Sequence, residues 1–159
     1  MFKNVGSLSV LLLASCLFLF SNVALATTIF DKNFSGHFTV KFENGKLKYE
    51  VTVIKGKKEG LEIFYFENGT KKIQTNYKDD KEDGVWNQWY ENGQLKLEAH
   101  YSNGVEHGSF KQWFDNGQIR AESNFIHGKK EGLERAWDRY GNLKYETLYK
   151  DGQAAESKN

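Results

Sequence analysis

Histidine and carboxylate side chains are the groups in this sequence that could bind a metal ion, and they form no recognisable ligand set. The four histidines are His37, His100, His107 and His127. They make no His-x-x-x-His pair and no combination with cysteine, whereas a zinc site needs three or four converging ligands. His107, with Glu106 beside it, falls in a charged turn that we expect to face solvent. The sequence therefore predicts no metal site.

Nucleophilic and acid–base chemistry are not indicated either. Ser35, Ser109 and Ser123 lack the strand–turn–helix context of a nucleophile elbow. The carboxylates recur at repeated positions, whereas an acid–base pair needs one member in a special environment. The glycine-punctuated loops, such as residues 127–132, open no helical pattern, so they are not phosphate-binding loops. We expect no catalytic residue, no cofactor and no enzymatic activity.

Aromatic and cationic side chains offer the one surface that is suited to recognition. Four aromatic residues are predicted to lie opposite four cations on one face of a sheet, which would add cation–π contacts of about 0.5–1 kcal/mol each when exposed. One interpretation is a partner-binding face, because aromatic side chains give large contact areas at low entropic cost. The other is that the aromatics only protect this face of the sheet, and both can hold together. The predicted pairs are Tyr65–Lys72, Trp89–Lys96, Trp113–Arg120 and Trp137–Lys144.

These residues are positioned by a repeat of 24 residues. Glycine returns at this spacing from Gly36 to Gly132 and from Gly45 to Gly141. Fixed-period self-similarity is the signature of a repeat architecture. The predicted organisation is a signal peptide (1–26), a capping segment over the first sheet edge (27–35), five units and a flexible tail (156–159). The units are 36–59, 60–83, 84–107, 108–131 and 132–155.

Each unit is predicted to be a β-hairpin around Asn-Gly, as at Asn92-Gly93. A two-residue turn needs positive φ at both positions, which Asn tolerates and Gly adopts freely. With this loop, Tyr90 would face Leu95. The other predicted facing pairs are Gln88–Leu97, Trp86–Ala99 and Trp89–Lys96.

The fifth unit carries Tyr140-Gly141 instead of Asn-Gly, which predicts a strained turn or one of another type. Alternation then gives an apolar face, which includes Phe64, Trp86 and the residues that precede the turns, and a charged face. The residues expected before the turns on the apolar face are Phe42, Phe66, Tyr90 and Phe114. The expected fold is all-β: an elongated antiparallel array of five hairpins with about ten strands.

The first 26 residues read as a leader for export. A basic start is followed by an apolar run from Leu8 to Phe20 and by the small-x-small pattern Ala24-Leu25-Ala26. This pattern predicts a secretory signal peptide, because 13 apolar residues are short for a span that needs about 20. We expect a periplasmic or extracellular protein.

Lipidation is the alternative fate of the leader. Leu13-Ala14-Ser15-Cys16 resembles a lipobox, in which Cys16 would be lipidated and would anchor the chain to a membrane. Leu17 to Phe20 would then follow the lipid, where a polar linker is usual. Cys16 is the only cysteine, so the chain beyond the leader has no disulfide.

Composition limits the partners. Lys3 is the only charged residue before Thr27, so 21 of the 22 basic residues and all 21 acidic ones lie beyond the leader. This balance excludes the basic surface that nucleic acid requires. It also disfavours an acidic lipid surface.

The recurring unit resembles a known repeat family. Gly84–Lys96 and Gly108–Arg120 share Gly-x-(Trp/Phe)-x-x-(Trp/Tyr)-(Tyr/Phe)-(Glu/Asp)-Asn-Gly-x-(Leu/Ile)-(Lys/Arg), which is similar to the variant MORN repeat of bacterial proteins, often labelled YwqK-like antitoxins. The resemblance covers Gly36 to Gly152. It implies a β-hairpin scaffold that binds proteins and sometimes lipids, with no catalytic motif, and it defines no single activity.

The function expected from these observations is a non-catalytic, exported repeat scaffold for protein–protein interaction, with antitoxin-like neutralisation of a partner as one form. The alternative is a module that binds glycan, cell wall or a membrane surface. Membrane association would require lipidation at Cys16 or surface binding. The sequence assigns no oligomeric state.

Overall fold

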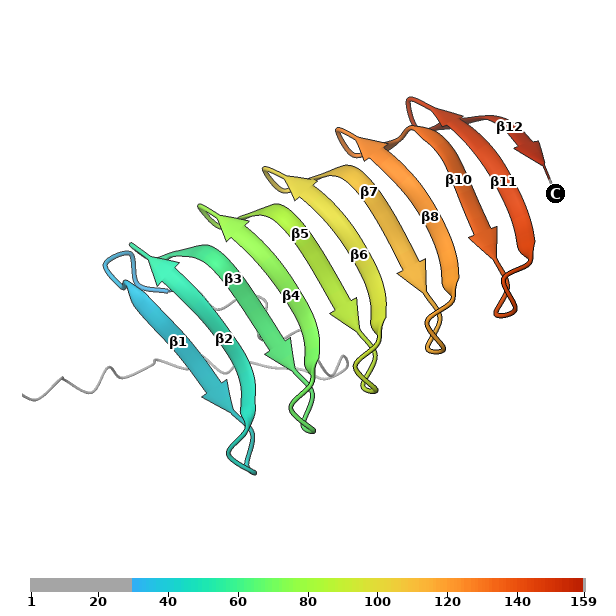
Figure 1. The fold of residues 1–159 in the computed structure, drawn as a ribbon. Helices are drawn as coiled ribbons and strands as arrows, with labels where there is room; N and C mark the ends of the chain where they lie inside the picture. Colours follow the sequence, from blue (N-terminus) through green and yellow to red (C-terminus); the bar gives the residue numbers. More distant parts are fainter. Residues whose placement is uncertain (1–29, 159) are drawn as a thin grey trace, which may run out of the picture.

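The structure is a computed structural model, and it describes residues 30–158. These residues form one antiparallel sheet of 12 strands in which each strand pairs with the next along the chain (Figure 1). The short β9 lies off this path and pairs with β8. The predicted fold class, an elongated all-β array of hairpins, is confirmed. No helix that is long and apolar enough to span a membrane occurs within residues 30–158.

The strands return with the predicted period, but β3, β5 and β7 each begin three residues before the predicted starts of the second, third and fourth units. The bounds are β1 (Gly36–Lys41), β2 (Leu47–Ile54), β3 (Lys57–Tyr65), β4 (Lys71–Lys78), β5 (Lys81–Trp89), β6 (Leu95–Ser102), β7 (Val105–Trp113), β8 (Ile119–Ile126), β9 (Lys129–Lys130), β10 (Gly132–Trp137), β11 (Leu143–Lys150) and β12 (Gln153–Lys158).

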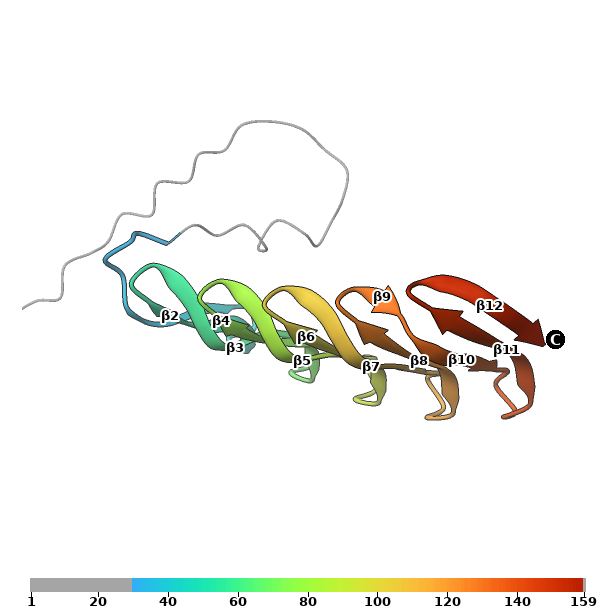
Figure 2. The same ribbon diagram turned by 90° about the horizontal axis from the view of Figure 1, so that it is seen from above.

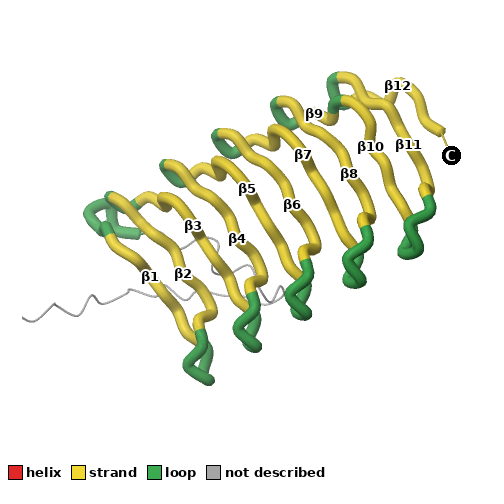
Figure 3. The backbone as a smooth tube through the Cα atoms, viewed as in Figure 1, coloured by secondary structure: helices red, strands yellow, loops and turns green. Residues whose placement is uncertain are grey.

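Two rows of turns join the strands at their opposite ends (Figure 3), and the rows bend to opposite sides of the sheet (Figure 2). The mid-unit turns, which contain Asn-Gly, are longer than predicted. In the third unit the N–H of Tyr90 donates to the carbonyl of Gln94 (2.8 Å), and the N–H of Gly93 donates to the carbonyl of Tyr90 (2.9 Å). Only Gly93 has positive φ (86°), and Asn92 does not. The turn is therefore a type I turn that ends in a left-handed glycine, the common three-residue hairpin loop.

The longer turn corrects the predicted register at the end of each hairpin. The pairs Trp86–Ala99 and Gln88–Leu97 are confirmed. Trp89, however, pairs with Leu95 across a β-bulge, so the predicted pairs Tyr90–Leu95 and Trp89–Lys96 are wrong. The extra turn residue displaces the register by one position after Gln88.

The fifth mid-unit turn follows the same pattern as the others. The N–H of Asp138 donates to the carbonyl of Asn142 (2.9 Å), and Gly141 has φ 86°. The residue before this glycine does not need positive φ, so Tyr140 is accepted there. The expected strain or change of turn type at Tyr140-Gly141 is therefore wrong.

The inter-unit turns are the two-residue turns with positive φ at both positions. Asn103-Gly104, for example, has φ values of 52° and 80° between the paired residues Ser102 and Val105. These are the geometries of type I′ hairpins. Asp80 takes the glycine position in one turn, with φ 66°.

The core lies on the apolar face at the N-terminal end of the sheet. Tyr49, Val51 and Val53 are fully buried, and Phe30 and Phe34 pack against them. The described part of the predicted capping segment thus covers this face, and it does not lie along the free edge of β1. The carbonyl of Phe34 accepts the N–H of Gly56 (2.8 Å), which ties the segment to the first inter-unit turn.

The end of the chain adds a strand. The predicted flexible tail, 156–159, is instead included in β12 as far as Lys158, and β12 pairs with β11. The backbone ladder continues past the fifth unit because nothing in this segment, such as proline, removes a donor.

Candidate partner-binding face

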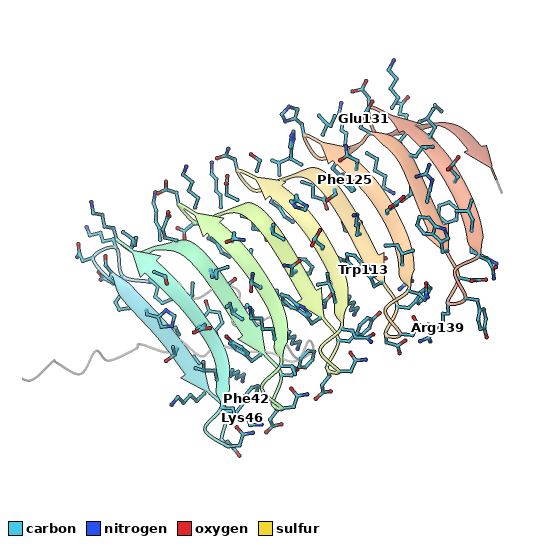
Figure 4. The ribbon with its side chains drawn as sticks, in the orientation of Figure 1. Phe42, Lys46, Trp113, Phe125, Glu131 and Arg139 are labelled. Carbon is cyan, nitrogen blue, oxygen red and sulfur yellow. The ribbon has the colours of Figure 1, made fainter. Side chains whose placement is uncertain are left out.

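Four aromatic side chains form a line across the sheet, which we call the aromatic row: Tyr65, Trp89, Trp113 and Trp137. Each stands at the end of the first strand of its unit (β3, β5, β7 and β10) and is partly exposed. Figure 4 shows Trp113 at this position on β7. The sequence repeat therefore places one aromatic residue of the row in each of four neighbouring units.

The cations lie over other rings than predicted, so the pairs Tyr65–Lys72, Trp89–Lys96, Trp113–Arg120 and Trp137–Lys144 are corrected. In the first four units the cation lies over the ring of the residue that immediately precedes the mid-unit turn. The Lys Nζ or Arg Cζ to ring-centroid distances are 5.6 Å for Lys48–Phe42, 5.5 Å for Lys72–Phe66, 5.4 Å for Lys96–Tyr90 and 5.7 Å for Arg120–Phe114. The physical reason is the longer turn, which shifts the second strand by one residue. Phe42, Phe66, Tyr90 and Phe114 thus contact the cations of the charged face, although they were expected to belong to the apolar face.

The fifth unit has no ring at this position. Asp138 replaces it, and Lys144 contributes to lowering the pKa of Asp138, after the larger effect of its hydrogen bonds from Asn142.

Two members of the aromatic row have additional contacts. The Nζ of Lys71 lies 5.8 Å from the ring centroid of Trp89. The hydroxyl of Tyr65 donates to Oε1 of Glu50 (2.5 Å), and burial together with this hydrogen bond raises the pKa of Tyr65 to about 12. Trp113 and Trp137 lie opposite Ile119 and Leu143. The row is therefore apolar at its C-terminal half and polar at its N-terminal end.

Hydrogen bonds between the mid-unit turns keep the row straight. The Oδ1 atom of Asn92 accepts the N–H of Gln94 (3.0 Å), and its Nδ2 donates to the carbonyl of Asp115 in the next unit (3.1 Å). Asn44, Asn68 and Asn116 make the same two kinds of bond. Asn was expected to supply positive φ, and its role is instead to connect neighbouring units.

The charged face carries cross-strand ion pairs near the C-terminal end. Arg135 contacts Glu146 (2.6 Å) and Glu122 (3.2 Å), and these hydrogen bonds raise its pKa. The carboxylates lie on the charged face, and the sequence analysis did not identify Arg135 as their partner. The repeat could have indicated it, because Arg135 lies 24 residues after Lys111. Lys111 stands opposite Glu98 and Glu122 on the two neighbouring strands.

The histidines are placed apart except for one pair. His107 and Glu106 lie on β7, so the charged turn predicted for them is wrong. The ring of His107 is 5.2 Å from that of His127, which lies in the inter-unit turn after β8. His37 contacts Glu50 (3.1 Å), and His100 lies beside Ser109 (3.1 Å). In residues 30–158, no three His, Cys, Asp or Glu side chains come together as metal ligands. Cys16 and the predicted signal peptide lie outside the described residues.

The sequence reasoning missed two ion pairs on the apolar face: the buried pair Lys58–Glu62 and the partly buried pair Lys130–Glu134. The sequence could have indicated these pairs, because charged residues stand at equivalent positions of two units where alternation predicts apolar ones.

Comparison with known proteins identifies the repeat. The model of the MORN repeat variant matches residues 35–55, 58–79, 82–103, 106–127 and 130–151. No curated protein matches the chain. Each matched segment begins at the start of a repeat's first strand and ends in the following inter-unit turn, apart from the first, which begins just before β1.

Proposed function

Because this chain belongs to the MORN repeat variant family, we propose that it is an exported, non-catalytic scaffold that binds a partner protein through its aromatic row. MORN repeats generally serve as scaffolds in protein or membrane interactions and are generally non-catalytic. Neutralisation of the partner, as by an antitoxin, is one form of this function.

The observation that supports the proposal most directly is the alignment of the aromatic row. Trp89 and Trp113 are at its centre, both partly exposed, and the Asn hydrogen bonds fix the spacing between their units. A rigid line of large aromatic side chains suits a protein interface, since binding energy concentrates in such residues. Their rings lose little conformational entropy on binding because their positions are already fixed.

The surroundings of the row favour a protein partner over nucleic acid. The cations beside it are engaged with rings or carboxylates of this chain, and the overall charge is nearly balanced. A phosphate backbone needs uncommitted basic residues. A partner that contributes apolar side chains with a few polar groups fits the row best.

A binding experiment tests this function. Residues 27–159 are used as bait with envelope and secreted fractions, and the matched variant is Trp89→Ala with Trp113→Ala. Tyr140→Ala is the control, since Tyr140 is 90% exposed on a turn outside the row. A stoichiometric protein that is captured by the wild type and the control and lost with the double variant would support the proposal.

Other outcomes would overturn it. If the double variant remains folded in a urea titration and still captures the protein, the row is not the binding face. Retention on purified cell wall or flotation with anionic vesicles, without a captured protein, would transfer the function to glycan or membrane binding.

Export is tested separately, by the mass of the protein recovered from cells. A chain that begins at Thr27 would support cleavage of a signal peptide. A lipid-modified chain that begins at Cys16 would support the anchored alternative, and an intact leader would contradict export by either route.

A further inference from the structure

Two units of the apolar face bring a lysine, a glutamate and a tyrosine together. In the first of these clusters, Nζ of Lys58 lies 2.5 Å from Oε1 of Glu62 and 4.8 Å from the ring centroid of Tyr77. The hydroxyl of Tyr49 also donates to Glu62 (2.7 Å). The ammonium group therefore has both a carboxylate and an aromatic ring as partners, which is the arrangement that stabilises a cation away from water.

The same cluster returns three units later. Nζ of Lys130 lies 2.5 Å from Oε1 of Glu134 and 4.9 Å from the ring centroid of Tyr149. Lys130 and Lys58 are separated by three repeats. The position of the ammonium group is thus a property of the repeat backbone that does not depend on one local sequence.

A bulge in the strand explains why residues four apart meet. In an extended strand they would be about 13 Å apart. Here Val51 pairs with Glu62 and Val53 with Lys58, so β3 has two extra residues opposite β2. Gly60, with φ 76°, lies within this bulge. The bulge folds the strand and brings the two side chains together.

The two central units keep the bulge and change the side chains. Tyr77 pairs with Glu82 and Thr75 with Trp86, around Gly84 with φ 113°. Glu82 therefore replaces the lysine, and Trp86 replaces its glutamate partner.

The next unit makes the same exchange. Tyr101 pairs with Glu106 and Ala99 with Phe110, and Phe125 on β8 occupies the tyrosine position (Figure 4). We call these six residues the central surface: Glu82, Trp86, Tyr101, Glu106, Phe110 and Phe125.

The central surface has carboxylates and rings without a cation of its own. In the described part of the chain, neither Glu82 nor Glu106 forms an ion pair, and no Lys or Arg lies over Tyr101 or Phe125. Lys58 is the cation that influences Glu82, and it is already paired with Glu62. All six side chains are partly exposed, so they remain accessible from solution.

The electrostatic surroundings of Glu82 are unfavourable for its charge. Burial raises the pKa of Glu82, and the nearby Glu62 and Glu106 raise it further, while Lys58 acts in the opposite direction. Burial raises the pKa of Tyr101, and the nearby Glu106 and Glu82 raise it further. A positive charge placed between Glu82 and Glu106 would relieve this repulsion.

We propose that the central surface binds a lysine or arginine side chain that a partner protein presents on an apolar segment. The flanking lysines show that a charged group at this repeat position lies against the ring on the next strand. In the central surface Glu82 and Glu106 hold that position, so the partner's cation would lie beside these carboxylates and over the ring of Tyr101 or Phe125. Trp86 and Phe110 replace the glutamates of the flanking clusters and provide apolar contact for the residues on either side of the cation. The occupant must be apolar as well as basic, because a free cation would leave these rings uncovered.

The chain itself shows how a segment covers this face. Phe34 precedes Lys58 by one repeat and packs on the core of the first unit, with Phe30 stacked on it at 5.6 Å. A partner segment would continue the same cover over the third and fourth units. This surface lies on the opposite side of the sheet from the aromatic row, so the inference does not depend on the proposed function.

The test uses random peptides displayed on phage as the probe and the full protein as the target. Peptides selected on the wild type are compared with the double variant Glu82→Gln with Glu106→Gln. These changes keep the side-chain shape and remove the charge, so the variant is expected to fold. Trp89→Ala with Trp113→Ala is the control for the other face.

The expected result is a set of peptides that share a lysine or arginine next to apolar residues. They should lose about tenfold or more in affinity on the double variant and bind the control normally. Replacing the shared basic residue of a peptide by norleucine should cause a similar loss. If no peptide is selected, if the selected peptides share no cation, or if they bind the double variant equally well, the proposal is wrong.

A second variant checks the geometry. Glu82→Lys with Trp86→Glu recreates the Lys58–Glu62 pair within the central surface. The new lysine would place a positive charge where the partner's cation binds, so peptide binding should fall while urea titration shows that the variant remains folded. Retained binding by this folded variant would contradict the proposed position of the cation.

Discussion

Lys58 and Glu62 form an ion pair that is almost completely enclosed, with Nζ and Oε1 2.5 Å apart and residue exposures of 8% and 4%. Burying two charges is costly, and their mutual attraction offsets the cost only when both are present. The stability of the N-terminal half of the sheet therefore depends on the presence of both residues.

Replacing Glu62 alone should be strongly destabilising. Glu62→Gln keeps an acceptor for Tyr49 and leaves the ammonium of Lys58 uncompensated, with an expected loss of about 3–5 kcal/mol in the free energy of unfolding. Urea titration measures this loss. The matched variant Glu134→Gln should lose clearly less, because the side chains of Lys130 and Glu134 are 33% and 14% exposed. Equal losses would contradict the importance of enclosure.

The Asn hydrogen bonds between mid-unit turns should contribute measurably to stability. Asn92→Ala removes the bonds to Gln94 and Asp115, and each hydrogen bond is worth about 1 kcal/mol. Asn92→Asp keeps the acceptor for the N–H of Gln94 and removes only the donor to the next unit. Thermal and urea unfolding should rank the wild type above Asn92→Asp and that variant above Asn92→Ala.

Tyr140→Asn is the control for this series. It places Asn at the equivalent position of the last mid-unit turn within residues 30–158, and in this part of the chain no further mid-unit turn supplies a carbonyl. Its stability should stay close to that of the wild type. A gain as large as the loss in Asn92→Ala would mean that the bond to the next unit is unimportant.

Asp80 combines an unfavourable backbone conformation with a hydrogen bond. It has φ 66°, and its Oδ1 accepts the N–H of Lys58 (2.6 Å). Asp80→Ala keeps the strain and loses the bond, so it should cost about 1 kcal/mol in the free energy of unfolding. Asp80→Asn keeps an acceptor and tolerates the left-handed region, so it should be nearly neutral. Urea titration of the two variants checks this order, and the reverse order would contradict it.

The stability contributed at Glu82 should depend on pH. Its pKa is raised in the folded protein, so the folded state holds the proton more tightly than the unfolded chain. Below about pH 4 both states are protonated, and the site costs nothing. As the pH rises through the raised pKa, the folded state must enclose a carboxylate, and stability is lost.

The variant Glu82→Gln measures this effect. It should match the wild type in acid and exceed it in stability at neutral pH, as followed by urea titration across the pH range. NMR titration of the carboxyl carbon of Glu82 checks the cause. A variant that is less stable than the wild type at neutral pH would contradict the assignment.

Much of the fold could be predicted from the sequence because the repeat fixes it many times over. The five units, the hairpins and the pairs Trp86–Ala99 and Gln88–Leu97 follow from the spacing of glycine and from alternation. The turn type did not follow, because Asn-Gly occurs both in two-residue turns and in the longer turn seen at Gly93. The choice between them decides which ring lies under Lys96, and it depends on the whole backbone ladder.

The apolar face was harder to predict than the turns. Alternation alone places Lys58 and Glu62 about 13 Å apart, so their contact could not be inferred without the bulge at Gly60. The replacement of this lysine by Glu82 in the next unit can be interpreted only when that contact is known. The aromatic row, in contrast, was identified from the sequence, and the structure corrects the cations that accompany it.

The hydrogen bonds between units limit how this protein can change in length during evolution. They link positions 20 to 23 residues apart, as in the bonds of Asn92 to Asp115 and of Asn103 to Asp83. An insertion or deletion of any length other than the 24-residue repeat would misalign both rows of turns. Loss of residues 84–107 would instead join equivalent positions and leave a shorter array intact. The natural step for gain or loss of binding residues is therefore one complete repeat.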